Sequence, residues 1–142
     1  MNPKVTKAIV AGIAGTAVMT LIMKVAPMMG MPKMDPAAML SMMMGVPLVI
    51  GWVMHFMIGI VFAIGYALFF MKLVRKVSSP VLKGALFGLA AFVFAQLAMG
   101  VMGAMMGGMP PMEGSMMLMA IGSIMGHVVF GIVVALMVKD NA

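Results

Sequence analysis

Charged side chains are scarce in this sequence, and cysteine is absent. Only 8% of the 142 residues are charged and 65% are hydrophobic, whereas an average soluble domain carries about 25% charged residues. A soluble fold could not cover its surface with so few charges, so we expect the lipid bilayer to be its main solvent. Because there is no cysteine, disulfides, thiolate metal sites and a cysteine nucleophile are excluded.

The motifs of enzymes and of nucleic-acid-binding proteins are also missing. The sequence has only three acidic residues, and it contains no nucleophile elbow, phosphate-binding glycine loop, zinc-protease helix or pair of catalytic carboxylates. The formal net charge is +6, but no basic stripe is interleaved with exposed aromatic residues, as nucleic-acid binding requires. We therefore expect a non-enzymatic protein that does not bind nucleic acid.

Long apolar runs make up most of the chain. A helix that spans a membrane needs about 20 mostly apolar residues, and four stretches meet this requirement, at about 8–26, 48–71, 84–106 and 115–138. The runs are continuous and lack the alternation of period two that is typical of strands. The sequence therefore predicts an all-α membrane protein, a bundle of four transmembrane helices.

Lysine and arginine are divided unequally between the two sides of this bundle. Seven fall on the side of the termini: Lys4, Lys7, Lys72, Arg75, Lys76, Lys83 and Lys139. Only Lys24 and Lys33 fall on the other side, together with Asp35 and Glu113. Because cytoplasmic loops carry the excess of positive residues, we expect both termini and the linker 72–83 to be cytoplasmic. This topology suits a multi-pass protein of the prokaryotic inner membrane.

The two halves of the chain resemble each other, so we expect a single domain built from a tandem, parallel repeat of a two-helix unit. Repeat 1 covers about residues 7–71 and repeat 2 about residues 83–138. Lys7 and Gly12 match Lys83 and Gly88 at an offset of 76. Such a repeat has its axis along the membrane normal and predicts a compact bundle with pseudo-twofold symmetry.

The second and fourth spans match best, at an offset of 72. Gly51, His55, Gly59 and Ala63 correspond to Ser123, His127, Gly131 and Ala135. In both sets the residues are four apart and share one helix face, and small residues on such a face let helix backbones approach closely in lipid. The predicted helix-packing residues are Gly12, Gly51, Gly59, Gly88, Ser123 and Gly131.

Methionine is concentrated in the two loops opposite the termini, which hold 17 of the 25 methionines between residues 28–44 and 99–119. In the first loop, Asp35 followed by Pro36 predicts a helix cap with proline at the first helical position. We expect a short interfacial helix over 36–44, ended by Gly45 and Pro47. We expect Pro111 to begin the fourth helix in the same way.

Histidine occurs only at positions 55 and 127, which the repeat relates to each other. A histidine within a span is costly unless it faces the bundle interior and finds a partner, so we expect both rings to face the same axis. Two neutral imidazoles can ligate a metal ion or the iron of a b-type haem. Alternatively, each ring donates a hydrogen bond to a neighbouring helix and serves packing alone.

The methionine load favours a soft metal, because thioether sulfur binds Cu(I) without deprotonation. The alternative is that methionine is a flexible apolar filler in these loops. The candidate metal ligands are His55, His127, Met28, Met31, Met34, Met54, Met105, Met109, Met112 and Met125. Asp35 and Glu113 form either a shared acidic site or helix caps paired with Lys24 or Lys33.

Three strings in the first half carry a likeness to known proteins: residues 12–20 (GIAGTAVMT), 30–32 (GMP) and 51–59 (GWVMHFMIG). They resemble small uncharacterised bacterial and archaeal inner-membrane proteins of the YagU-like type. The resemblance implies a small prokaryotic polytopic protein and carries no established activity.

Two functions remain open from the sequence. The first is binding of a metal, copper in particular, with haem b held by the two histidines as a variant. The second is an accessory subunit of a larger respiratory or oxidase-type membrane complex, with no cofactor of its own. Other membrane subunits or further copies of this chain are the expected protein partners.

Overall fold

The computed structural model describes residues 2–109, 111 and 113–139, and this part of the chain is helical with connecting loops and no strands. The elements in chain order are α1 (Pro3–Val25), η1 (Ala26–Met29), α2 (Pro36–Met44), α3 (Leu48–Gly65), the π-helical turn η2 (Tyr66–Phe70), α4 (Met71–Leu73), α5 (Pro80–Met105) and α6 (Met116–Met137). Four of the continuous helical stretches are long and apolar enough to cross a membrane: Pro3–Met29, Leu48–Leu73, Pro80–Met105 and Met116–Met137. The prediction of an all-α, multi-pass membrane protein is confirmed.

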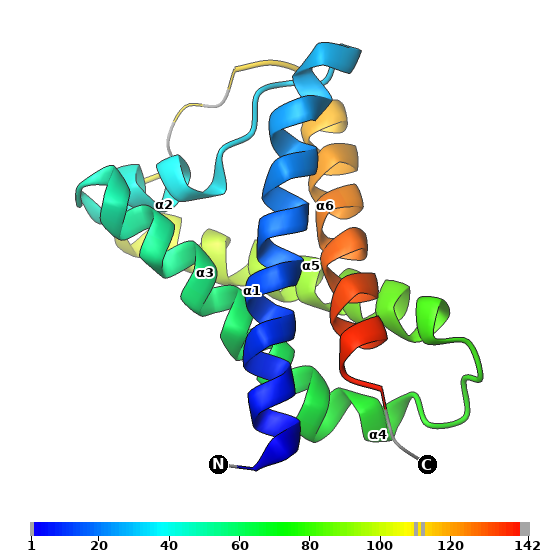
Figure 1. The fold of residues 1–142 in the computed structure, drawn as a ribbon. Coiled ribbons are helices and arrows are strands. Elements are labelled where there is room, and N and C mark those ends of the chain that lie inside the picture. The colour runs from blue at the N-terminus through cyan, green and yellow to red at the C-terminus, as the bar shows by residue number, and fades with distance from the viewer. Residues whose placement is uncertain (1, 110, 112, 140–142) are drawn as a thin grey trace.

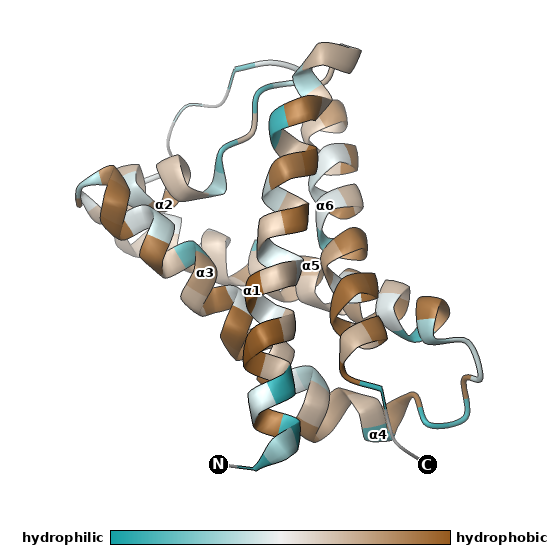
Figure 2. Ribbon diagram, in the orientation of Figure 1, coloured by the Kyte–Doolittle hydropathy of each residue, from teal (hydrophilic) through white to brown (hydrophobic). Residues whose placement is uncertain are grey.

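Polar residues at the helix ends explain where the spans begin. The Asn2 side chain accepts a hydrogen bond from the backbone N–H of Lys4 at 3.0 Å, and Ser79 accepts one from the N–H of Leu82 at 3.3 Å. Each cap satisfies a donor that lacks a partner within its own helix. Figure 2 shows the hydrophilic residues gathered at helix ends and loops, with apolar residues along the spans.

The short helix α2 is formed as expected. Asp35 Oδ1 accepts a hydrogen bond from the N–H of Ala38 at 2.9 Å, and Gly45 ends the helix with φ of +63°, a left-handed conformation that suits glycine. Helix α2 packs on α3 at Gly51, where a Cβ atom would lie 3.1 Å from the carbonyl carbon of Ala37. Gly51 therefore makes room for α2.

The fourth helix does not begin at Pro111, so this expectation was wrong. Pro111 lies in the loop, and α6 begins at Met116 after Ser115. The physical reason is Gly114, whose φ of +111° cannot be continued into a right-handed helix. The second loop consequently has no counterpart of α2 in the part that the structure describes.

The helices form two crossing pairs, α1 with α3 and α5 with α6, which are joined through a contact between α1 and α6. The start of α1 and the end of α6 lie at the same end of the molecule, here called the terminal end. Residues 24–47, together with the described residues between 106 and 115, lie at the other, here called the methionine end. Helices α3 and α5 hardly touch, apart from the edge-to-face rings of Phe62 and Phe94, whose centroids are 5.8 Å apart. The compact, symmetric bundle that the sequence predicts is therefore not formed on this side, where α3 and α5 lack the close contact that α1 and α6 make.

The contacts within the two helix pairs repeat with a single offset of 72. A Cβ atom at Gly12 would lie 2.7 Å from Ile60 Cα, and a Cβ atom at Gly84 would lie 2.5 Å from Ile132 Cα. The structural equivalent of Gly12 is thus Gly84, not Gly88, and the offset of 76 suggested for the first and third spans is one helical turn too long. Glycines recur every four residues on these faces, so the sequence pattern fits both registers.

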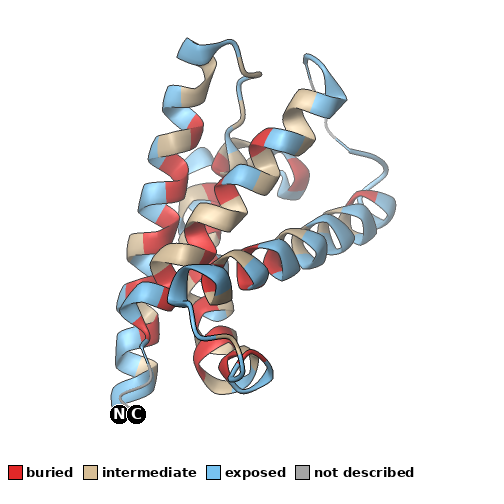
Figure 3. Cartoon of the chain, turned by 90° about the vertical axis from the view of Figure 1, so that its right-hand side faces the viewer, coloured by how far each residue is buried: buried red, intermediate tan, exposed pale blue. Residues whose placement is uncertain are grey.

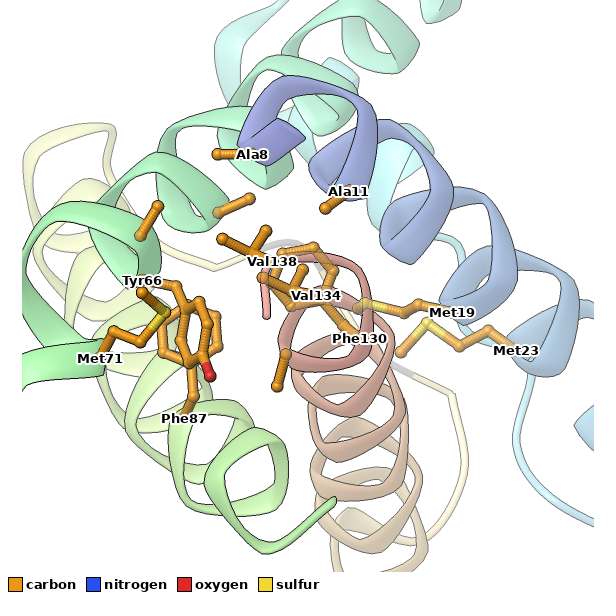
Figure 4. Packing of buried hydrophobic residues seen from close by; sticks show 13 residues of the cluster. Ala8, Ala11, Met19, Met23, Tyr66, Met71, Phe87, Phe130, Val134 and Val138 are labelled. Carbon is orange, nitrogen blue, oxygen red and sulfur yellow. The ribbon is translucent and has the colours of Figure 1, made fainter. Parts of the chain in front are cut away.

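Most of the core lies in the terminal half of the molecule, and Met19 and Met23 of α1 extend it towards the methionine end. Figure 4 shows Tyr66 and Phe87 packed beside Val134 and Phe130, with Ala8 on α1 facing them. Figure 3 shows the buried residues gathered where the helices cross and exposed residues along the ends that diverge. Close packing in this half and divergence in the other leave a space between the helices at the methionine end.

Candidate functional site

A cavity of about 910 Å³ occupies the space between the diverging helices. All four spans, α2 and both methionine-end loops line it, and its walls are mainly apolar. Pockets that bind small molecules or cofactors typically measure about 300–1,000 Å³ and combine apolar walls with a few polar groups. The polar groups here are Thr16, Lys33, Asp35, His55, Gln96, Glu113, Ser115, Ser123 and His127.

His55 reaches the cavity from α3 and is 8% exposed. Its Nε2 atom lies 3.1 Å from the hydroxyl oxygen of Thr20 on α1, so the two groups share a hydrogen bond. The ring of Trp52, one turn away, and the ring of His55 are arranged edge to face, with their centroids 6.3 Å apart. The contact with Thr20 means that at least one nitrogen of His55 has a partner within the fold.

We expect Thr20→Val to lower the free energy of unfolding modestly, by about 0.6 kcal/mol and at most about 1.7 kcal/mol, the range measured for hydrogen bonds between membrane helices. The cause is loss of the partner of the His55 ring. Unfolding by steric trapping in bicelles would measure the difference. Thr6→Val, at an exposed position on the same helix, is the control, and an equal loss in both variants would contradict the role of Thr20.

His127 reaches the same cavity from α6 and makes a different contact. Its Nδ1 atom lies 2.8 Å from the backbone carbonyl oxygen of Ser123. A carbonyl can only accept, so Nδ1 carries the proton, and in the neutral ring Nε2 has a free lone pair. A backbone carbonyl bound to one nitrogen is the arrangement that orients a histidine for metal ligation through the other.

The repeat explains why the two histidines differ. In the second repeat, Phe92 on α5 takes the place that Thr20 has on α1, at the offset of 72. The Phe92 ring meets the His127 imidazole edge to face, with a centroid distance of 5.8 Å. Phenylalanine cannot form the hydrogen bond that Thr20 forms with His55. The structure thus brings both histidines to one cavity, and it leaves the Nε2 atom of His127 without a partner in the described chain.

Four methionines converge on one face of α6, at Gly122 and Gly126. A Cβ atom at Gly122 would lie 3.0 Å from Met34 Sδ and 3.4 Å from Met31 Cε. At Gly126 it would lie 3.0 Å from Met23 Cε, with Met19 Cγ at 3.4 Å. We call Met19, Met23, Met31 and Met34 the thioether cluster. Two of its members come from α1 and two from the first loop, and all four line the cavity that His127 also lines.

The other candidate metal ligands are scattered. Met109 lines the cavity and packs on Gly103, whereas Met54 is half-buried on α3 away from the cavity. Met28, Met105 and Met125 are exposed at 85%, 80% and 45%. Met112 lies outside the described residues.

The cluster residues missing from the sequence prediction are Met19 and Met23, both 5% exposed. The signal that could have identified them is their spacing of four on α1, which matches the spacing of Gly122 and Gly126 on α6.

Asp35 and Lys24, two charged groups of the methionine end, contact different parts of the fold and not each other. Asp35 caps α2, as expected, while Lys24 Nζ lies over the ring of Trp52, 5.2 Å from its centroid. Such a cation–π contact is worth about 0.5–1 kcal/mol at an exposed site. Asp35 and Glu113 form no ion pair with Lys24 or Lys33 among the residues that the structure describes. Within the described part of the chain, no three histidine or acidic side chains gather as ligands for a harder metal ion.

The chain belongs to a family with no assigned activity. A family model described as "Family of unknown function (DUF6789)" matches residues 2–141. No curated protein and no solved structure matches the chain. The comparisons thus support membership of an uncharacterised family and add nothing for the narrower likeness to YagU-like proteins.

Proposed function

We propose that the protein is a non-enzymatic membrane protein that binds copper, as Cu(I), at the thioether cluster. The observation that carries this proposal is the convergence of four methionine side chains from two segments on the Gly122–Gly126 face of α6. Thioethers are soft, neutral ligands that suit Cu(I). They also need no deprotonation, which matters at membrane depth, where charged groups are costly.

His127 supports the same proposal from the adjoining position on α6. Its Nε2 lone pair is free in the neutral ring because Nδ1–H is held by the Ser123 carbonyl. Imidazole suits copper as well as harder metals, so His127 can complete a set of thioether ligands. His55, whose Nε2 is bonded to Thr20, would have to give up that bond to join it. For the same reason, haem ligation by both histidines is the weaker variant.

We further propose that the terminal end of the molecule is cytoplasmic in a prokaryotic inner membrane. Seven of the nine lysine and arginine residues belong to the terminal end, and only Lys24 and Lys33 belong to the methionine end. The positive-inside rule assigns the richer side to the cytoplasm. In this orientation the thioether cluster lies on the external side, where it would receive copper from outside the cell.

The test is a titration with Ag(I), a redox-stable stand-in for Cu(I), of the purified protein in detergent. The combined variant Met19→Leu, Met23→Leu, Met31→Leu and Met34→Leu keeps side chains of similar volume and removes the sulfur. We expect its affinity to fall about 100-fold or more, beyond the 10–100-fold that loss of an outer-shell contact costs at metal sites.

The matched control replaces four exposed methionines with leucine, at Met28, Met29, Met105 and Met117, which are exposed at 85%, 82%, 80% and 69%. These changes remove the same number of sulfur atoms from outside the cluster. We expect the control to bind Ag(I) as the unaltered protein does. Equal losses in the two variants would mean that the ions bind methionine non-specifically, and would refute the site.

A second proposal is an accessory subunit of a larger membrane complex, and helix α5 is the observation that favours it. Beyond Ala91 this helix has a single buried residue, Gly103, up to its end at Met105. Its apolar residues Val93, Phe94, Leu97 and Val101 are between 55% and 66% exposed. Such a surface can contact lipid or another subunit. A metal-free protein that co-migrates with a large complex on native gels would favour this function over copper binding.

A further inference from the structure

Positive charge at the terminal end has no acidic counterpart among the residues that the structure describes. Seven of the nine lysine and arginine residues belong to this end. Only three residues are acidic: Asp35 and Glu113 belong to the methionine end, and Asp140 lies outside the described residues. Like charges gathered at a membrane surface repel one another, so an anion from outside the chain would be bound favourably there.

A cleft of about 200 Å³ lies at the same end of the molecule, between the start of α1 and the end of α6. Thr6, Lys7 and Val10 line it from α1, and Met137 lines it from α6. Val10 lies one turn further into the span than Thr6 and is 52% exposed, and Met137 is 40% exposed. The cleft therefore combines one charged group at the end of a span with apolar side chains that face lipid.

Lys7 supplies the charge of this cleft and is not engaged elsewhere in the fold. It is exposed, and its ammonium group forms no ion pair or hydrogen bond within the described part of the chain. The neighbouring Thr6 hydroxyl is already engaged, because it donates to the backbone carbonyl of Asn2 at 3.4 Å. An ammonium group has three N–H donors and binds phosphate as a point charge. Its long stem lets the charge reach the headgroup region of the bilayer.

We propose that this cleft binds the headgroup of an anionic glycerophospholipid. The phosphate contacts the Lys7 ammonium, and the glycerol and the first part of an acyl chain lie against Val10 and Met137. The volume of the cleft equals that of about seven water molecules at about 30 Å³ each. This space suits a phosphate and a glycerol group, and the remaining acyl chain lies in the surrounding lipid. Basic pockets between membrane helices bind such headgroups in this way.

The distribution of charge favours an anionic lipid over a zwitterionic one. A zwitterionic headgroup carries an ammonium group beyond its phosphate, and the described residues of the terminal end offer that group no acidic partner. Phosphatidylglycerol has the phosphate without the cation, so every nearby lysine attracts it. The proposal rests neither on copper binding nor on the orientation of the protein in the membrane.

The test is native mass spectrometry of the purified protein in a neutral detergent, titrated with phosphatidylglycerol or with phosphatidylcholine of the same acyl chains. We expect one phosphatidylglycerol molecule to bind at least about fivefold more tightly than phosphatidylcholine. Inorganic phosphate shares the anionic group but lacks the acyl chains, so an equal concentration of it should not displace the lipid. Displacement by inorganic phosphate, or equal affinity for the two lipids, would overturn the proposal.

Lys7→Gln separates a site in the cleft from diffuse attraction to the whole terminal end. The matched control is Lys76→Gln, which removes the same charge from an exposed position in the cytoplasmic-type linker, outside the cleft. We expect the affinity for phosphatidylglycerol to fall at least about fivefold in Lys7→Gln and to change less than twofold in Lys76→Gln, by about the diffuse contribution of one charge at a distance. Equal losses in the two variants would show that the lipid is held by net charge and not by the cleft.

Val10→Phe tests the apolar part of the cleft while Lys7 stays in place. The larger side chain would occupy the space assigned to the glycerol group, so we expect the preference for phosphatidylglycerol to be lost. Val93→Phe is the control, because Val93 is similarly exposed, at 55%, on the distant part of α5. Both positions face lipid, and size-exclusion chromatography without added lipid should show both variants folded. Unchanged binding in a folded Val10→Phe protein would refute the assignment of the lipid to this cleft.

Discussion

Gly88→Val is expected to prevent α5 from crossing α6, and so to leave the chain unable to reach its fold, whereas Gly100→Val on the same helix is expected to fold normally. A Cβ atom at Gly88 would lie 2.6 Å from Val128 Cα and 2.8 Å from the carbonyl carbon of His127. Both are backbone atoms of α6, which cannot move aside as a flexible side chain can. At Gly100 a Cβ atom would have no neighbour within 4 Å.

The comparison isolates the crossing because both positions are interior to α5 and the intrinsic cost of valine in a helix is the same at each. Overpacking a well-filled site usually costs about 1–3 kcal/mol, occasionally more, and we expect Gly88→Val to reach or exceed the upper figure. Size-exclusion chromatography and thermal unfolding in detergent would measure the difference. Similar profiles for the two variants would show that the helices do not cross at Gly88.

Gly126→Val should have the opposite combination of effects: a folded protein that has lost its metal site. The nearest atoms to a Cβ at Gly126 belong to Met23 and Met19, with Met23 Cε at 3.0 Å. These are side-chain atoms of flexible methionines, which can change rotamer at modest cost. The valine would occupy the space in which the thioethers gather and push them from the Gly122–Gly126 face. We expect the affinity for Ag(I) to fall about tenfold or more, a loss of at least 1.4 kcal/mol.

Gly100→Val again provides the control, since it adds the same side chain in the methionine-end half of α5 without touching the cluster. Unaltered Ag(I) affinity in a folded Gly126→Val protein would argue that the methionines only fill space. The Met→Leu variants test the sulfur atoms themselves, and Gly126→Val tests their arrangement. Agreement between the two would assign the ion to this face of α6 and not to the exposed loops.

Several features could be predicted from the sequence because they depend on local properties of the chain. Four apolar runs of sufficient length predict four spans whatever the tertiary contacts are. The helix α2 follows from the cap at Asp35, the proline after it and the left-handed glycine at position 45. Pro111 shows the limit of the same reasoning, because it resembles Pro36 locally while Gly114 delays the helix until Met116.

The arrangement of the spans depends on contacts between distant residues, which local patterns describe only up to a choice of register. Glycine every fourth residue on α5 allowed both Gly84 and Gly88 as the equivalent of Gly12, and only the backbone contacts with Ile60 and Ile132 decide for Gly84. The pairing of α1 with α6, and the lack of a matching contact between α3 and α5, has no signature in hydropathy. Lipid is as apolar as the side chains, so burial does not direct one helix to another.

For the candidate site too, some features follow from the sequence and others only from the tertiary structure. By itself the sequence determined that this is a four-span, methionine-rich membrane protein with two repeat-related histidines, because composition and spacing suffice for that. Only the tertiary structure decided that Met19 and Met23 join Met31 and Met34 on α6, and that His127 keeps a free nitrogen while His55 is bonded to Thr20. Those facts arise where separate helices meet or part, and small differences in packing set them.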